Sequence, residues 1–92
     1  MKSKISVQST GGAKYRVTID QGATKSTHEV GVSHVELAKY GGKATAERLV
    51  EASFEFLLER EPKESILPAF NISDIERYFP EYSKLIHQTL SS

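Results

Sequence analysis

The 92-residue sequence contains no cysteine and no tryptophan, one methionine and three prolines. Without cysteine the chain cannot form disulfides, thiol nucleophiles or thiolate zinc sites, and nothing in it points to an oxidising compartment. It also lacks any apolar run near the ~18–20 residues that a membrane helix needs, and its first residues lead into an alternating pattern instead of a signal-peptide core. We therefore expect a soluble, cytoplasmic protein with no membrane partner.

The chain also has no net charge, because 12 lysines and arginines balance 12 acidic residues. A neutral chain can offer a nucleic acid only a local basic patch, so this balance does not favour a nucleic-acid partner. The charges are nevertheless unevenly placed. Residues 1–46 carry seven basic and three acidic side chains, and the remainder carries five basic and nine acidic ones. Such a split is satisfied either inside the molecule or by head-to-tail pairing with a second copy.

Apolar and polar residues alternate through the first third of the chain, which predicts three short strands. Glycine-containing segments at 10–13 and 20–23 interrupt the alternation, and glycine supplies the positive φ that tight reversals need. The sequence therefore predicts an antiparallel three-stranded meander with one apolar face. That face collects Ile5, Val7, Tyr15, Val17, Ile19, His28, Val30 and Val32.

The central part of the chain predicts helices. Ser33 and Glu36 have the spacing of a capping box, which indicates a short helix that should end at Gly41 and Gly42. A stripe of helical period then predicts the main helix over residues 45–60. This stripe consists of Ala46, Leu49, Val50, Ser53, Phe54, Leu57 and Leu58, widened by Ala52 and Phe56.

The last third predicts shorter helices. Pro62 suits the first turn of a helical segment over 63–67 that stops before Pro68. Ser73 and Glu76 repeat the capping-box spacing, and the apolar stripe that follows crosses Pro80. Residues 74–90 therefore form either one kinked helix or two abutting helices.

These elements predict one α+β domain over residues 1–92, with the sheet within 4–32 and the helical part within 33–90. We expect a two-layer arrangement, in which three or four helices pack on the apolar face of the meander, because a sheet with a bare apolar face is unstable in water.

Two segments carry a resemblance to a known family. They read FLLEREPKESIL at 56–67 and IERYFPEY at 75–82. The chain resembles a family of small, stand-alone, uncharacterised bacterial proteins that carry similar segments after a strand-rich half. It departs from that family at Pro68, where a charged residue is more usual, and at Asn71, where aspartate is. The resemblance implies a folded domain and a bacterial setting, and no mechanism.

The sequence offers no assignable chemistry. The three histidines, His28, His34 and His87, have no metal-ligand spacing, and structural roles account for them better. No serine lies in a nucleophile elbow, and the glycine pairs lack the dinucleotide and phosphate-loop patterns. We therefore expect no catalytic residue, no metal and no cofactor, and a protein that is not an enzyme.

Four glutamates on the main helix stand four residues apart and form one row, in which like charges repel. They are Glu47, Glu51, Glu55 and Glu59. One interpretation is that the helix N-terminus, Arg48, Arg60 and water relieve the row. The other is that the row meets a basic surface, supplied by this chain's lysines or by a partner.

Residues 60–64 and 77–82 are the best candidates for a recognition surface, because both combine a proline-fixed backbone with charge and the second adds three aromatics. We expect a protein–protein interaction or self-association module that uses them. The candidate residues are Arg60, Glu61, Lys63, Glu64, Arg77, Tyr78, Glu81 and Tyr82. The competing interpretation is that Tyr78, Phe79 and Tyr82 belong to the core.

A DNA-binding dimeric regulator is the alternative. Residues 27–60 follow the strand–helix–helix order of ribbon-helix-helix proteins, which dimerise through the strand and read DNA with it. The short first helix, the two preceding strands and the carboxylate of Glu29 on the ribbon all depart from that pattern.

Overall fold

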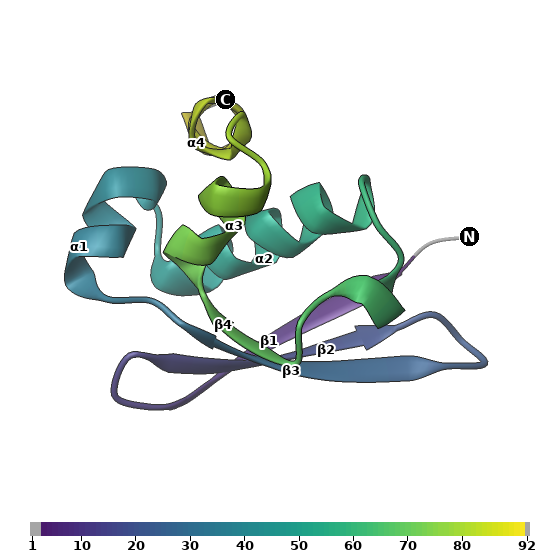
Figure 1. Cartoon of the computed structure of the whole chain (residues 1–92). Helices are drawn as coiled ribbons and strands as arrows, with labels where there is room; N and C mark the ends of the chain where they lie inside the picture. The colour runs from purple at the N-terminus through teal and green to yellow at the C-terminus, as the bar shows by residue number, and fades with distance from the viewer. Residues whose placement is uncertain (1–2, 92) are drawn as a thin grey trace.

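The computed structural model describes residues 3–91 and shows one sheet with helices above it (Figure 1). The elements in chain order are β1 (Lys4–Gly11), β2 (Lys14–Asp20), β3 (Lys25–Gly31), α1 (His34–Glu36), the π-helical turn η1 (Leu37–Gly41), α2 (Ala46–Leu58), the 3-10 turn η2 (Lys63–Ser65), β4 (Ala69–Asn71), α3 (Ile72–Tyr78) and α4 (Tyr82–Ser91). The predicted α+β class is confirmed.

The sheet contains the predicted meander and one further strand, in the order β1-β2-β3-β4. β1, β2 and β3 pair antiparallel, with Val17 of β2 opposite Val7 of β1 and His28 of β3. Gly11, Gly12 and Gly22 have positive φ in the two hairpin turns, as the glycine pattern predicts. β4 pairs parallel to β3 over three residues.

Helix α2 lies across the apolar face of the sheet, and its buried side is the predicted stripe. Thr45 caps its first turn by accepting a hydrogen bond from the backbone N–H of Arg48 at 3.1 Å. Ser33 and Glu36 form the predicted capping box, and Gly42 ends the short helical segment at φ +59°. Burial of these apolar side chains, at about 25 cal/mol per Å² removed from water, is the main stabilising contribution.

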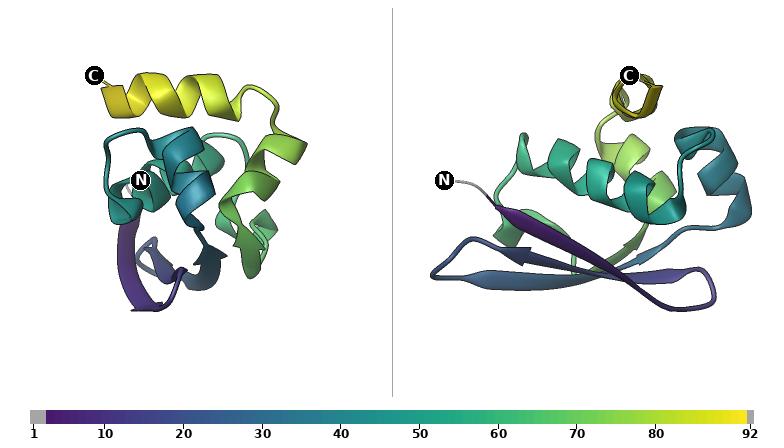
Figure 2. Two further views of the ribbon diagram at one scale, coloured as in Figure 1. Left: turned by 90° about the vertical axis from the view of Figure 1, so that its left-hand side faces the viewer. Right: turned by 180° about the vertical axis from the view of Figure 1, so that it is seen from behind.

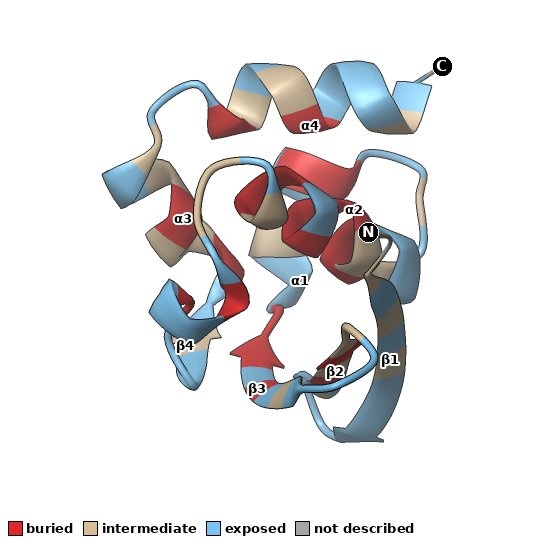
Figure 3. Cartoon of the chain, turned by 90° about the vertical axis from the view of Figure 1, so that its right-hand side faces the viewer, coloured by how far each residue is buried: buried red, intermediate tan, exposed pale blue. Residues whose placement is uncertain are grey.

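Buried residues lie on the strands and on the helices above them (Figure 3), and the apolar ones among them that are completely buried come from both layers. They are Val17, Ile19, Val30, Leu49, Val50, Phe54, Ile72 and Tyr82. Ser53 is also fully buried and is satisfied, because its hydroxyl donates to the Leu49 carbonyl oxygen at 2.7 Å and accepts from the Tyr82 hydroxyl at 2.7 Å.

Two details differ from the sequence prediction. The segment 69–71 is a strand that the sequence did not predict, because three residues are too few to show a period. Asn71, with Asp74, forms the capping box of α3 in place of Ser73 and Glu76. Of the two arrangements predicted for residues 74–90, the structure has the two helices, because α3 ends at Tyr78 and α4 begins at Tyr82.

Helix α4 packs on α2 from the side away from the sheet, so that it adds a further layer to the predicted two (Figure 2). Among the described residues, no helix is long and apolar enough to cross a membrane.

Candidate functional site

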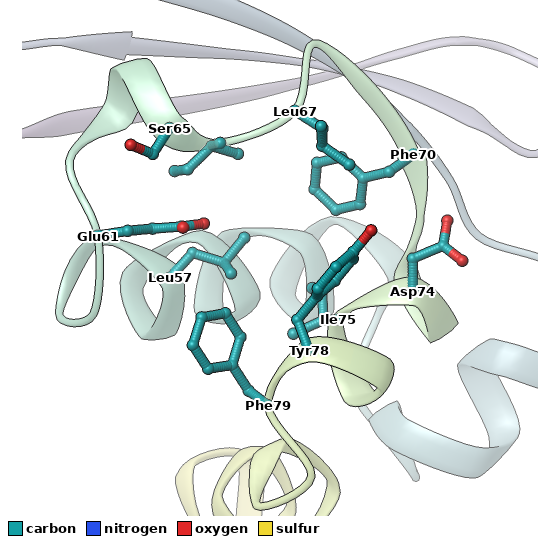
Figure 4. Close-up of a pocket in the computed structure, with 10 residues that line it drawn as sticks. Leu57, Glu61, Ser65, Leu67, Phe70, Asp74, Ile75, Tyr78 and Phe79 are labelled. Atoms are coloured by element: carbon teal, nitrogen blue, oxygen red, sulfur yellow. The ribbon is translucent and has the colours of Figure 1, made fainter.

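A cleft of about 370 Å³ opens between α3 and the segment that runs from η2 to β4 (Figure 4). Its lining is mostly apolar. The lining residues are Leu57, Glu61, Ser65, Ile66, Leu67, Phe70, Asp74, Ile75, Tyr78 and Phe79.

Buried side chains form the inner part of the cleft and exposed ones form its rim. Leu57, Ile66 and Ile75 belong to the hydrophobic core. The side chains of Leu67 and Tyr78 face each other across the opening (Figure 4), yet they are 49% and 69% exposed. Two large apolar side chains held at that exposure beside a concave surface are typical of a binding site.

Hydrogen bonds to β3 hold the wall of the cleft that the segment from η2 to β4 forms. His28 Nδ1 donates to the Leu67 carbonyl oxygen at 2.8 Å, and the backbone N–H of Glu29 donates to the Pro68 carbonyl oxygen at 2.8 Å. In the neutral ring, His28 Nε2 accepts from the Ser26 hydroxyl at 2.8 Å. The wall is therefore tied to the sheet before any ligand arrives.

Helix α3 forms the opposite wall, and hydrogen bonds at its N-terminus hold it in place. The Asp74 carboxylate accepts from the backbone N–H of Asn71 at 3.0 Å, and the Glu36 carboxylate accepts from the backbone N–H of Ser73 at 2.9 Å. Phe79, at the end of this wall, contacts Phe56 of α2 edge to face, with 5.9 Å between the ring centroids. Both walls are thus preorganised, which lowers the entropic cost of binding.

Two carboxylates give the cleft its charge, with Glu61 and Asp74 on different sides of it (Figure 4). Asp74 is engaged by Asn71 and lies 3.7 Å from an Arg77 guanidinium nitrogen. Glu61 is a half-buried residue, and its carboxylate makes no hydrogen bond or ion pair with any residue in 3–91. A carboxylate without a partner beside an apolar cleft favours a cation or a hydrogen-bond donor next to it.

The two predicted recognition segments do meet. Arg60 Nε donates to Glu81 Oε2 at 3.2 Å, and its guanidinium lies 3.6 Å from the centre of the Phe56 ring. A backbone N–H at Glu81 and the Arg60 guanidinium hold the pKa of the Glu81 carboxyl below its usual value. Of the predicted residues, Glu61 and Tyr78 line the cleft.

The remaining predicted residues lie outside the cleft, and two of them correct the prediction. Tyr82 is completely buried, because its ring packs against Tyr40 and Phe56, and burial raises the pKa of its hydroxyl. Lys63 is 2% exposed, and its amine forms an ion pair with the Glu64 carboxylate. Neither Tyr82 nor Lys63 can form part of a recognition surface. Arg77 points outward beside Asp74.

The histidines have structural surroundings. His28 is buried against Phe54, with 5.4 Å between ring centroids, and His87 Nε2 donates to the Lys39 carbonyl oxygen at 2.9 Å. His34 is exposed at the start of α1. Within residues 3–91, no three histidine or acidic side chains converge in a group that could hold a metal ion.

Sequence reasoning missed half of the cleft. Ile66, Leu67, Phe70 and Asp74 come from a stretch too short to show a period. One signal in the sequence could have indicated the cleft. Leu67 is apolar and stands directly before Pro68, although no predicted apolar stripe includes it.

Comparisons with known proteins found no matching family model, curated protein or solved structure. The resemblance of residues 56–67 and 75–82 to small bacterial proteins therefore stays a prediction.

Proposed function

We propose that this chain is a non-enzymatic interaction module of the bacterial cytoplasm, and that its cleft binds a segment of a partner protein. The segment carries a large apolar side chain next to a lysine or arginine. The observation that supports this most directly is the unpaired Glu61 carboxylate beside an apolar cleft.

The chemistry of the cleft favours binding over catalysis. Its polar groups are two carboxylates, the Ser65 hydroxyl and the Tyr78 hydroxyl, and none of them has a neighbouring base within a hydrogen bond. An apolar side chain of the partner would bury Leu67 and Tyr78, while its cationic neighbour would engage Glu61.

The ribbon-helix-helix arrangement receives no support from the sheet. A ribbon dimer needs a free edge on the strand that pairs across the interface. β3 lies between β2 and β4, and β4 occupies its outer edge at Glu29, Val30 and Gly31, which are half of the residues 27–32 predicted for that role. We therefore do not propose DNA binding.

The test uses isotope-labelled protein and two capped dipeptides, N-acetyl-phenylalanyl-lysine amide and N-acetyl-phenylalanyl-glutamate amide. We expect the basic dipeptide to shift the amide resonances of Leu67 and Tyr78 and the acidic one to bind at least several-fold more weakly. Glu61→Gln should remove this preference, and Tyr78→Ala should weaken both dipeptides.

Glu47→Gln is the matched control, because it makes the same charge change at an exposed position of α2 that does not line the cleft. It should leave the preference intact. Equal binding of both dipeptides, or shifts that avoid the cleft, would reject the proposal. Sedimentation that shows a dimer, which Tyr78→Ala dissociates, would also reject it, since a second copy would then be the occupant.

A further inference from the structure

The second open surface of the molecule is the outer edge of β1, at the side of the sheet opposite β4. β1 is eight residues long and pairs only with β2 (Figure 3). In the described chain, no segment donates to or accepts from the outer edge of β1. An edge strand of this length carries a row of unpaired N–H and C=O groups, which can pair with another extended chain.

A groove of about 410 Å³ runs beside this edge, between β1 and α2. Its apolar part is Ile5 and Leu58. Its rim is acidic, and its lining residues are Ser3, Ile5, Glu51, Glu55, Leu58 and Glu59. The groove thus joins an open backbone edge to three of the four glutamates of the row on α2.

Arginines relieve this row only in part. An Arg48 guanidinium nitrogen lies 2.9 Å from a Glu51 oxygen and 3.7 Å from a Glu55 oxygen, and Arg60 lies 3.5 Å from Glu59. The two pairs of Arg48 are exposed, and such pairs contribute little, while Arg60 is shared between Glu59 and Glu81. Among the described lysines, none forms an ion pair with the row.

We propose that the edge of β1 binds an extended basic segment of a partner protein by strand addition. The backbone of the segment would continue the sheet beyond β1. Because side chains alternate along a strand, every second residue would face α2, where a lysine or arginine meets Glu51, Glu55 or Glu59. This site is separate from the cleft of the proposed function, and neither depends on the other.

Charge also decides against a second copy as the occupant. If two β1 strands paired antiparallel about a two-fold axis, both α2 helices would lie on the same face of the joined sheet. The two glutamate rows would then approach each other across the junction, and like charges repel. A basic strand removes that repulsion and neutralises the row.

The probe is an alternating lysine–threonine peptide of about eight residues, a typical strand length. Its lysines would face α2, and its threonines would face the open side of the sheet, where β1 presents Ser6 and Gln8. We expect shifts and slowed exchange of the β1 amides, no change at Leu67 and Tyr78, and loss of binding at high salt. An alternating glutamate–threonine peptide should not bind.

N-methylation of the peptide tests strand addition directly. In an antiparallel pair, only alternate N–H groups point to the neighbouring strand. Methylating one set of alternate residues should abolish binding, and methylating the other set should leave it intact. Equal effects of the two patterns would overturn the proposal.

Variants of α2 test the charge. The double variant Glu51→Gln, Glu55→Gln should weaken the lysine peptide roughly fivefold to tenfold at low salt, since two exposed ion pairs are lost. Glu47→Gln, in the same row but outside the groove, should change binding less than about twofold. Equal losses in the two variants, no binding, or shifts confined to the cleft would overturn the proposal. A peptide-free dimer with protected β1 amides would overturn it in favour of a second copy.

Discussion

His28 shows how one residue serves the fold and the cleft together. It lies on the apolar face that the alternation of β3 predicts, and burial there requires partners for both ring nitrogens. Ser26, two residues earlier, supplies one partner, and the carbonyl of Leu67 supplies the other. The second partner lies 39 residues away, so sequence alone could place His28 in the core but could not show that it fixes the wall of the cleft.

Glu36 is the residue at which stability should depend on pH. Partial burial works to raise the pKa of its carboxyl, but hydrogen bonds from Ser33 and Ser73 lower it below the ordinary value of 4.5. A lowered pKa in the folded state stabilises the fold above the unfolded pKa, and the contribution disappears as the pH falls through the folded value. Glu36→Gln should therefore cost about 1–2 kcal/mol at neutral pH.

Urea unfolding at neutral and acidic pH measures this effect. The Glu36→Gln variant should lose less stability than the parent protein between neutral pH and values below 4.5, because the parent alone must protonate this carboxyl. Glu29→Gln removes an exposed carboxylate of β3 and should follow the parent curve. Parallel curves for Glu36→Gln and the parent would contradict the assigned role of the carboxylate.

At the scale of elements, long patterns could be predicted and short ones could not. The three meander strands and α2 are each at least seven residues long, which leaves room for a period, and periodicity predicted all four. β4 has three residues and exists because β3 provides a partner for it. Gly31 of β3 lies opposite Asn71 of β4, and this contact was invisible in the sequence.

The contact between Gly31 and Asn71 gives a prediction for α3. A Cβ added at Gly31 would clash with Asn71 Oδ1, the atom that caps the first turn of α3. Gly31→Ala should push this side chain out of its cap and cost about 1–2 kcal/mol in chemical unfolding.

A double-mutant cycle shows whether the cost passes through the cap. Asn71→Ala alone should cost about 1 kcal/mol, and Gly31→Ala in that background should add little, because the displaced group is already gone. Additive costs would instead place the effect of Gly31 in the strand.

The whole molecule explains why the recognition surface was only half predicted. Residues 60–64 and 77–82 do come together, joined by the Arg60–Glu81 ion pair, and they contribute Glu61 and Tyr78 to the cleft. The apolar stripe predicted across Pro80 could not show whether the side chain of Tyr82 points into the core or to the surface. α4 begins anew at Tyr82, so its phase is set by packing on α2 and not by continuity with α3.

The two proposed sites lie at opposite edges of the sheet, and α2 separates them. Leu57 lines the cleft on the β4 side, and Leu58, the next residue, lines the groove on the β1 side. Coupling between sites requires an element with two alternative arrangements that both ligands bias. α2 packs against the sheet and against α4, and we therefore expect it to keep one arrangement.

The basic dipeptide and the lysine–threonine peptide should therefore bind at the same time. Calorimetric titration of one probe into protein saturated with the other should change the dissociation constant by less than about twofold. Competition between the probes would mean that both bind one acidic surface and that at least one site is assigned wrongly. A change of more than about fivefold without competition would show that α2 moves, which its burial on two sides argues against.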